Sequence, residues 1–337
     1  MPRCQSLAHT LTSLSTHITN PLQDLQHVSC LTSMTRLQLS IDFPQASQPG
    51  ALDQMTAQIT QITGLKALRL YNFPHSSAKS MSLGLSNLQE LESAGFGPVL
   101  DVQHCTQLTC LDGEGSLKQV YLPAGQLCCL EQLSLNITSG CTLFNLGDAL
   151  RLSSLAFIKQ CPIDVQRVSS STFTNSSSAG SWPLLPSLHS LRIGVMRCAP
   201  PAIWAKYGSF CELELASYRH PMLPAWFADL TSLKKLTLGS TSLQQFPSSV
   251  LELTQLQELC LCLTIFPKYI VQFASFLHLS SLILRLDCSV KVSANDAHLP
   301  AFQDSVRNLE ATLLKRLPNA SVRMVAGGRG WTFEQNL

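Results

Sequence analysis

The sequence predicts an α/β solenoid, in which short parallel strands stack turn upon turn and short helices, 3-10 turns and loops return the chain. Two observations predict this fold class. Three segments, beginning at Leu233, Leu256 and Leu279, carry the spacing LxxLxL at offsets of 23 residues, and similarity at a fixed period is the signature of repeat architectures. The composition agrees, because 45% of the 337 residues are apolar and 13% are charged. Such a chain can bury a long continuous core.

Further copies of this spacing extend the array towards the N-terminus. They begin at Met34, Leu65, Leu88, Leu108, Leu130, Leu152, Leu188 and Phe210, and Leu11 begins a degenerate first copy. In each LxL step the leucines point into the core and the residue between them points outwards, since side chains alternate along a strand. We therefore expect about 10–12 repeats in a single domain over residues 1–325, followed by a tail over 326–337.

The repeats carry the resemblance to a known family. Leu233 to Leu243 match the leucine-rich repeat pattern LxxLxLxx(N/C/T)xL. Return segments that begin at Leu223-Pro224, Phe246-Pro247 and Phe266-Pro267 place proline where the first turn of a short helix accepts it. Over residues 210–290 the chain resembles intracellular leucine-rich repeat proteins of the plant Ras-group-related and Ras-scaffold types. The resemblance implies a curved horseshoe with its parallel sheet on the concave side.

Two spacings depart from the period and predict insertions. One lies near 42–60, and the other, near 163–183, contains a Ser-rich stretch that cannot bury enough apolar area to become ordered. We expect surface loops at both places. A helix over 301–316 and a strand over 321–325 are expected to close the C-terminal end of the core. After the strands, the pattern predicts buried, hydrogen-bonded threonines at positions Thr138, Thr241 and Thr264.

The net charge and the cysteine content limit the functional classes that fit the sequence. A formal net charge of +2 and the absence of long Lys/Arg runs argue against nucleic acid. No segment predicts a transmembrane helix, and the N-terminus lacks the apolar stretch of a signal peptide. The 13 cysteines are scattered, and several adjoin apolar runs, as expected of reduced thiols. We expect a cytoplasmic protein; the resemblance adds the cytoskeleton and the ciliary axoneme as alternatives.

No combination of residues predicts catalysis, a cofactor or a metal. The nucleophile-elbow, phosphate-loop, zinc-protease and dinucleotide motifs are absent. The pairs Cys260-x-Cys262 and Cys128-Cys129 are more simply packing residues, and His189 and His220 have no nucleophile or acid assigned to them. We therefore expect a protein that is not an enzyme.

The concave face is the largest regular surface that the pattern predicts. Its central column holds Gln38, Arg69, Glu92, Ser134, Ala156, Arg192, Glu214, Thr237, Cys260 and Ile283. Since solenoids of this class hold partners on that surface, we expect a protein partner and no nucleic acid or membrane. The residues expected to bind it are Arg69, Tyr71, Glu92, Asn136, Arg192, Glu214, Lys235, Glu258 and Arg285.

Several functions share this fold. A monomeric scaffold or adaptor is the first hypothesis. A substrate receptor of a ubiquitin ligase is the second, although no F-box-like segment precedes the first repeat; because the array begins almost at Met1, a truncated gene is an alternative. A secreted receptor would need a signal peptide and cysteine-rich caps. The resemblance also implies cytoskeletal or phosphatase-regulating roles.

Overall fold

The computed structural model describes residues 10–18, 31, 33–41, 51–71, 81–96, 98–115, 117–123, 129–137, 141–160, 163–166, 182–196, 199–220, 222–239, 247–263, 278–287, 308, 311, 315, 317, 320–328 and 331–332. The chain forms two compact units, Met1–Leu188 and His189–Leu337. We call them the N-terminal and C-terminal units and describe each by itself. The single domain expected over 1–325 stays a prediction.

The N-terminal unit is built on a parallel main sheet. Its strands pair in chain order: β1 (Ser13–Ile18), β2 (Arg36–Ile41), β3 (Ala67–Tyr71), β5 (Glu90–Phe96), β7 (Cys110–Gly115), β9 (Gln132–Ile137) and β11 (Ser154–Gln160). The leucines of the LxL steps, such as Leu68 and Leu70, are fully buried. This stacking confirms the predicted leucine-rich repeat solenoid.

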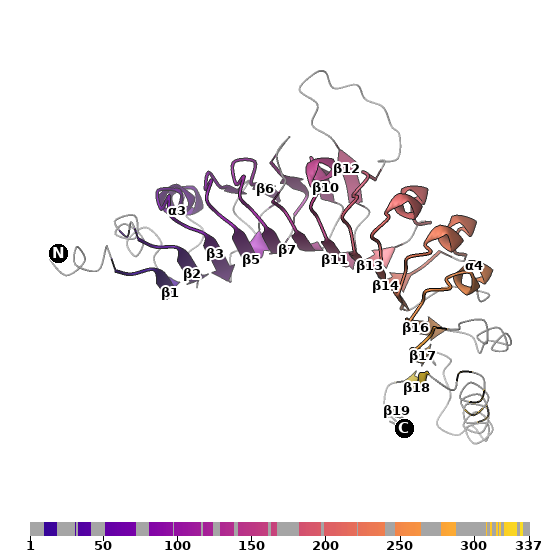
Figure 1. The fold of residues 1–337 in the computed structure, drawn as a ribbon. Helices are drawn as coiled ribbons and strands as arrows, with labels where there is room; N and C mark the ends of the chain where they lie inside the picture. Colours follow the sequence, from indigo (N-terminus) through magenta and orange to yellow (C-terminus); the bar gives the residue numbers. More distant parts are fainter. Residues whose placement is uncertain are drawn as a thin grey trace. The chain divides into compact units, whose positions relative to one another are not determined.

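A second parallel sheet covers the return side of the N-terminal unit, where the sequence predicts helices and 3-10 turns. It consists of β4 (Met81–Ser82), β6 (Val99–Asp101), β8 (Gln119–Tyr121), β10 (Cys141–Phe144) and β12 (Ile163–Gln166). Figure 1 shows β6, β10 and β12 on one side of the main strands. One of these repeats is only 20 residues long, because Glu90 pairs with Cys110. An extended strand spans the return with few residues.

Among the described residues of this unit, helical structure occurs at two places. Helix α3 (Ala51–Thr60) occupies most of the insertion expected near 42–60 and buries Met55 and Ile59, so that part is helical rather than the expected loop. A short 3-10 helix, η2 (Leu146–Asp148), follows Asn145, whose left-handed φ of 66° is held by a hydrogen bond from its side-chain amide to the Leu122 carbonyl, 2.9 Å. The Ser-rich stretch lies outside the described residues.

The C-terminal unit continues the parallel design. Its main sheet contains β13 (Ser190–Met196), β14 (Glu212–Tyr218), β15 (Lys235–Leu238), β16 (Glu258–Leu263), β17 (Ser281–Asp287) and β18 (Ser321–Gly328). Leu236, Leu259 and Leu282 stand in register on adjacent strands, which confirms the 23-residue period. The strand expected at 321–325 is β18.

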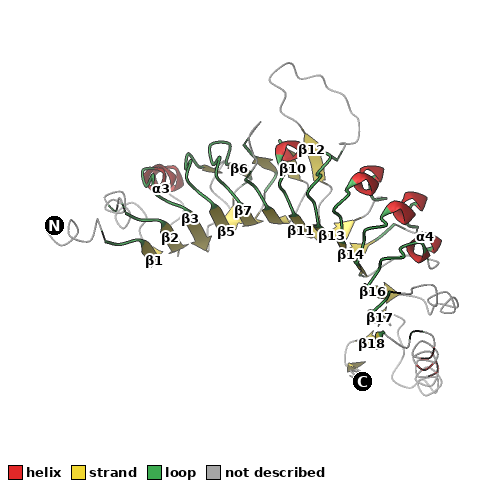
Figure 2. Cartoon of the chain, viewed as in Figure 1, coloured by secondary structure: helices red, strands yellow, loops and turns green. Residues whose placement is uncertain are grey.

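Short helices form the return side of the C-terminal unit, as the proline signature predicts. They are η3 (Ala202–Lys206), η4 (Ala225–Asp229) and α4 (Ser248–Leu251), each preceded by an extended proline, and Figure 2 shows them on one side of the strands. Trp204, Phe227 and Val250 point inwards and are fully buried. The third signature, at Phe266, lies outside the described residues.

The C-terminal end departs from the predicted boundaries. Strand β18 runs on to Gly328 and pairs antiparallel with β19 (Trp331–Thr332), so part of the expected 326–337 tail belongs to the sheet. Most of the helix expected over 301–316 lies outside the described residues, although Asn308, Ala311 and Lys315 are helical and exposed.

A ladder of backbone hydrogen bonds joins the starts of the main strands. One carbonyl accepts two successive N–H groups from the next turn: Thr12 accepts from Thr35 and Arg36, for example, and Lys234 from Gln257 and Glu258. Hydroxyl and thiol groups join the ladder from Thr35, Thr109, Ser153, Cys211 and Ser280. The polar side chains before these strands thus donate hydrogen bonds to backbone carbonyl groups of the preceding turn. The predicted threonines after the strand, Thr138, Thr241 and Thr264, lie outside the described residues.

Candidate functional site

The outward side chains of the main sheet form rows that cross the strands. The repeat pattern predicts this surface as the concave face. We call it the exposed face. Strand register sets its rows, because residues paired across adjacent parallel strands project from the same side. In the N-terminal unit the first row holds Ser13, Arg36, Ala67, Glu90, Cys110 and Gln132, and the second holds Ser15, Gln38, Arg69, Glu92, Asp112 and Ser134.

Three predicted site residues meet on β3 and β5. Arg69 is paired with Glu92 by register, and its Nε lies 3.1 Å from a Glu92 carboxylate oxygen. The Tyr71 hydroxyl donates to the other carboxylate oxygen over 2.9 Å. More than a third of each charged side chain is exposed. Arg69, Tyr71 and Glu92 therefore present a preorganised polar group to solvent.

The hydrogen bond to Glu92 raises the pKa of Tyr71 above its ordinary value, with desolvation and the Glu92 charge adding to the shift. A raised pKa means that the folded chain holds the phenolic proton more tightly than the unfolded chain does. The stabilisation is therefore complete at neutral pH and is lost as pH rises through the folded-state pKa.

Replacing Glu92 with glutamine is expected to lower the pKa of Tyr71, because the substitution removes the charge that disfavours the phenolate. Phenolate absorbance during an alkaline titration, with Tyr71→Phe used to identify the signal, measures the shift. Glu114→Gln is the matched control, since it removes one carboxylate from the same face without touching Tyr71. An equal shift in both variants would show that Glu92 has no specific effect.

Asn136 lies further along the exposed face, opposite Glu114. Its side-chain oxygen is buried and accepts no hydrogen bond from the described residues. Asp112 and Glu114, both exposed, add acidic groups on β7. The structure does not bring Asn136 into contact with the group formed by Arg69, Tyr71 and Glu92.

In the C-terminal unit, two further predicted pairs meet across adjacent strands. Arg192 Nε lies 3.1 Å from Glu214 Oε1, and Lys235 Nζ lies 2.9 Å from Glu258 Oε2. In both cases strand register places the partners opposite each other. Hydrogen bonding to Glu258 raises the pKa of Lys235, and the charges of Glu258, Glu212 and Glu214 reinforce the shift.

The remaining predicted residue, Arg285, belongs to β17 and pairs with Cys262 and Val325, but its side chain is outside the described set. Cys260 and Ile283 lie on the same face and are half-buried. All these positions belong to the outward rows, and whether they contact a partner stays a prediction.

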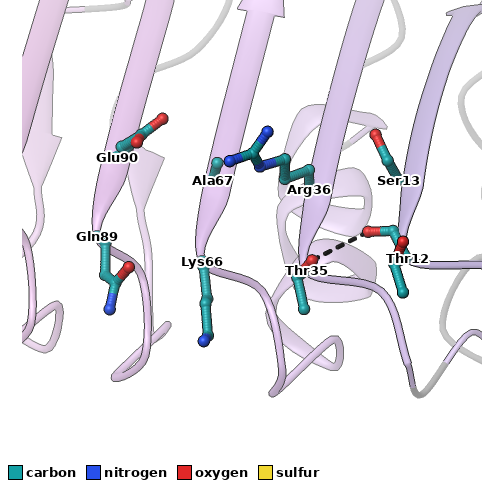
Figure 3. Close-up of a pocket in the computed structure, with 8 residues that line it drawn as sticks. All are labelled: Thr12, Ser13, Thr35, Arg36, Lys66, Ala67, Gln89 and Glu90. Carbon is teal, nitrogen blue, oxygen red and sulfur yellow. Dashed lines mark hydrogen bonds between the residues drawn. The ribbon is translucent and has the colours of Figure 1, made fainter.

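Sequence reasoning missed a pocket at the strand starts of the N-terminal unit. It measures about 450 Å³ and is lined by Thr12, Ser13, Thr35, Arg36, Lys66, Ala67, Gln89 and Glu90. Figure 3 shows the Arg36 side chain reaching towards Ala67, with Glu90 on the following strand. These residues stand just before the central column of the exposed face.

The described surface presents ion pairs and hydrogen-bonding groups. Among the described residues, no group of three or more His, Cys, Asp or Glu side chains could hold a metal ion. The six cysteines whose side chains the structure describes form no disulfide bond. Burial raises the pKa of Cys105 to about 11 and also raises that of Cys110, which lowers the thiolate population at neutral pH. No described helix is long and apolar enough to cross a membrane.

Comparison with known proteins does not assign the chain to a family. No family model matches the sequence, and no curated protein matches it. One similar solved structure is an internalin (inlF) from Listeria monocytogenes, 16% identical, with a TM-score of 0.44 over 83% of this chain and 82% of that chain. A leucine-rich repeat protein from Leptospira interrogans is also 16% identical, with a TM-score of 0.36 over 96% and 98%. Similarity at this level says nothing about function.

Proposed function

We propose that the chain is a non-enzymatic scaffold or adaptor that binds a protein partner through the exposed face of its main sheet. The observation that carries the proposal is the set of cross-strand ion pairs, Arg69–Glu92, Arg192–Glu214 and Lys235–Glu258. Exposed pairs of this kind contribute little to stability, typically about 0–1 kcal/mol. Their more useful property is that they hold long side chains in defined positions.

Preorganisation favours binding because fewer side chains must be ordered when a partner arrives. An arginine carries five donors, more than its opposite carboxylate can accept, so the Arg69–Glu92 and Arg192–Glu214 pairs retain donors for a partner. The exposed face also mixes both charge signs with tyrosine, asparagine and threonine, a composition that suits a protein surface better than a polyanion. We further infer that the protein acts as a monomer in the cytoplasm and is of the intracellular repeat type suggested by residues 210–290.

Exchanging the charges of one pair tests the proposal. Arg192→Glu combined with Glu214→Arg keeps an ion pair on the same strands but reverses its direction. The variant is expected to keep its unfolding free energy within about 0.5 kcal/mol, as surface changes usually do, and to lose proteins that the tagged wild-type chain captures from its host. Quantitative mass spectrometry of the captured proteins measures the loss.

The matched control is Lys206→Glu combined with Asp229→Lys, which exchanges two exposed charges on η3 and η4, away from the exposed face. Capture by this control should equal that of the wild type. If the control loses the same proteins, or if neither variant loses any, the exposed face of the C-terminal unit does not bind the partner.

A further inference from the structure

Arg36 and Glu90 depart from the pairing rule of the exposed face. Arg69, Arg192 and Lys235 each face a carboxylate on the adjacent strand and form an ion pair with it. Arg36 instead faces Ala67, and Ala67 faces Glu90 on the strand beyond. Within the described part of the chain, no ion pair includes Arg36, Lys66 or Glu90.

Ala67 creates the pocket between these charges. Its methyl group is the smallest side chain of the first row among the neighbouring strands, and it is only 7% exposed. Adjacent strands lie about 4.8 Å apart, so the backbones of Arg36 and Glu90 are separated by about 10 Å. Figure 3 shows the Arg36 side chain extending from β2 towards Ala67, with Glu90 on the strand beyond.

The sign of the charge changes across this pocket. Arg36 and Lys66 lie on the side of β2 and β3, where Arg69 is already neutralised by Glu92. On the other side, Glu90 is followed on β7 by the exposed carboxylates Asp112 and Glu114. An all-basic or an all-acidic ligand would therefore meet repulsion at one end.

We propose that this pocket binds an extended segment of a protein partner carrying an acidic and a basic side chain on the same face, two or four residues apart. The acidic side chain pairs with Arg36, the basic one pairs with Glu90, and the segment passes over Ala67 between them. The spacing follows from the geometry, since same-face side chains of an extended chain lie about 6.6 Å apart at two residues and about 13 Å apart at four, values that bracket the separation of about 10 Å. The inference rests on the proposed function and specifies the partner's chemistry.

A displayed library of random peptides, selected on the full-length chain, tests the spacing. Enriched peptides are expected to carry one acidic and one basic residue two or four positions apart, in either order, because a segment can cross the strands in both directions. A synthetic copy of an enriched peptide then serves as the probe. Selection of purely basic, purely acidic or uncharged peptides, or of no peptide, would overturn the proposal.

Variants of the pocket test the charges with that probe. Arg36→Glu is expected to weaken binding by about tenfold or more, because attraction becomes repulsion, and to prefer a version of the probe whose acidic residue is replaced by lysine. Lys118→Glu is the control, as it makes the same charge change at an exposed position before β8 in the second sheet. Arg36→Gln and Glu90→Gln, with weaker expected losses, serve if the reversal impairs folding.

The outcomes separate this inference from the proposed function. If the probe ignores Arg36 and Glu90 but loses affinity for the chain with the Arg192 and Glu214 charges exchanged, the exposed face binds and the pocket inference is wrong. If neither set of changes alters binding, both are wrong. If the pocket variants alone abolish binding, the partner's contact is confined to the N-terminal unit.

Discussion

Replacing Leu236 with alanine is expected to lower the free energy of unfolding by about 2–5 kcal/mol. The side chain is fully buried in β15, where register places it between Leu213 of β14 and Leu259 of β16. Removing its atoms loses their transfer free energy and leaves a cavity that neighbouring turns cannot fill completely. Chemical denaturation followed by far-UV circular dichroism measures the change.

The effect of Leu236→Ala should also be local, because each turn of a solenoid contacts only its neighbours. Hydrogen exchange is therefore expected to accelerate most in β14, β15 and β16. Thr237→Ala is the control, since Thr237 belongs to the same strand but faces outwards and is half-buried. Its cost should stay within about 0.5 kcal/mol. Similar losses in both variants would mean that the inward and outward positions of β15 have been exchanged.

The sequence alone predicts the main sheet well because the same physical requirement recurs in every turn. A repeat cannot cover its own leucines, so the positions of Leu236, Leu259 and Leu282 recur with a strict period. The Pro-containing return segments are predictable for a similar reason. Proline at 224 and 247 fixes the start of a helical turn, and the apolar residue three positions later is buried.

The second sheet of the N-terminal unit was not predictable from the repeat spacing. Its strands are two to four residues long, which is too short to give a clear alternation of apolar and polar residues. The main-sheet pattern also weakens there, because Ser93 and Gly113 occupy inward positions that hold leucine or isoleucine in most turns. Leu100 and Val120 of the second sheet contribute to the buried core instead.

The candidate surface was predicted as single residues, whereas the structure organises them into pairs. Reading the central position of each LxL step identifies Arg69, Glu92, Arg192 and Glu214 without showing which of them face each other. Lys235 and Glu258 emerge as a pair only once strand register is fixed. The pocket over Ala67 was harder to predict from the sequence, because a 31-residue repeat that contains α3 joins the strands of Arg36 and Ala67. No period relates those two positions.

Gly239→Ala is expected to cost about 3 kcal/mol, the upper part of the range for overpacking a well-packed site. Gly239 follows β15, and a Cβ at this position would overlap the backbone carbonyl of Ala216 on the adjacent turn. Neither backbone can move easily. The Gly239 N–H donates to the Leu215 carbonyl over 2.8 Å, and the Gly239 carbonyl accepts from the Tyr218 N–H over 3.3 Å.

The matched control is Gly208→Ala, because a Cβ there would meet no atom within 4 Å. Its effect should lie near zero or be slightly stabilising, since alanine reduces the conformational entropy of the unfolded chain. Chemical denaturation of the two variants measures the difference. If both substitutions cost the same small amount, the contact between Gly239 and Ala216 is loose enough to admit a methyl group. A large loss for Gly239→Ala alone would mean that close backbone approach, as well as leucine burial, holds β14 against the turn after β15.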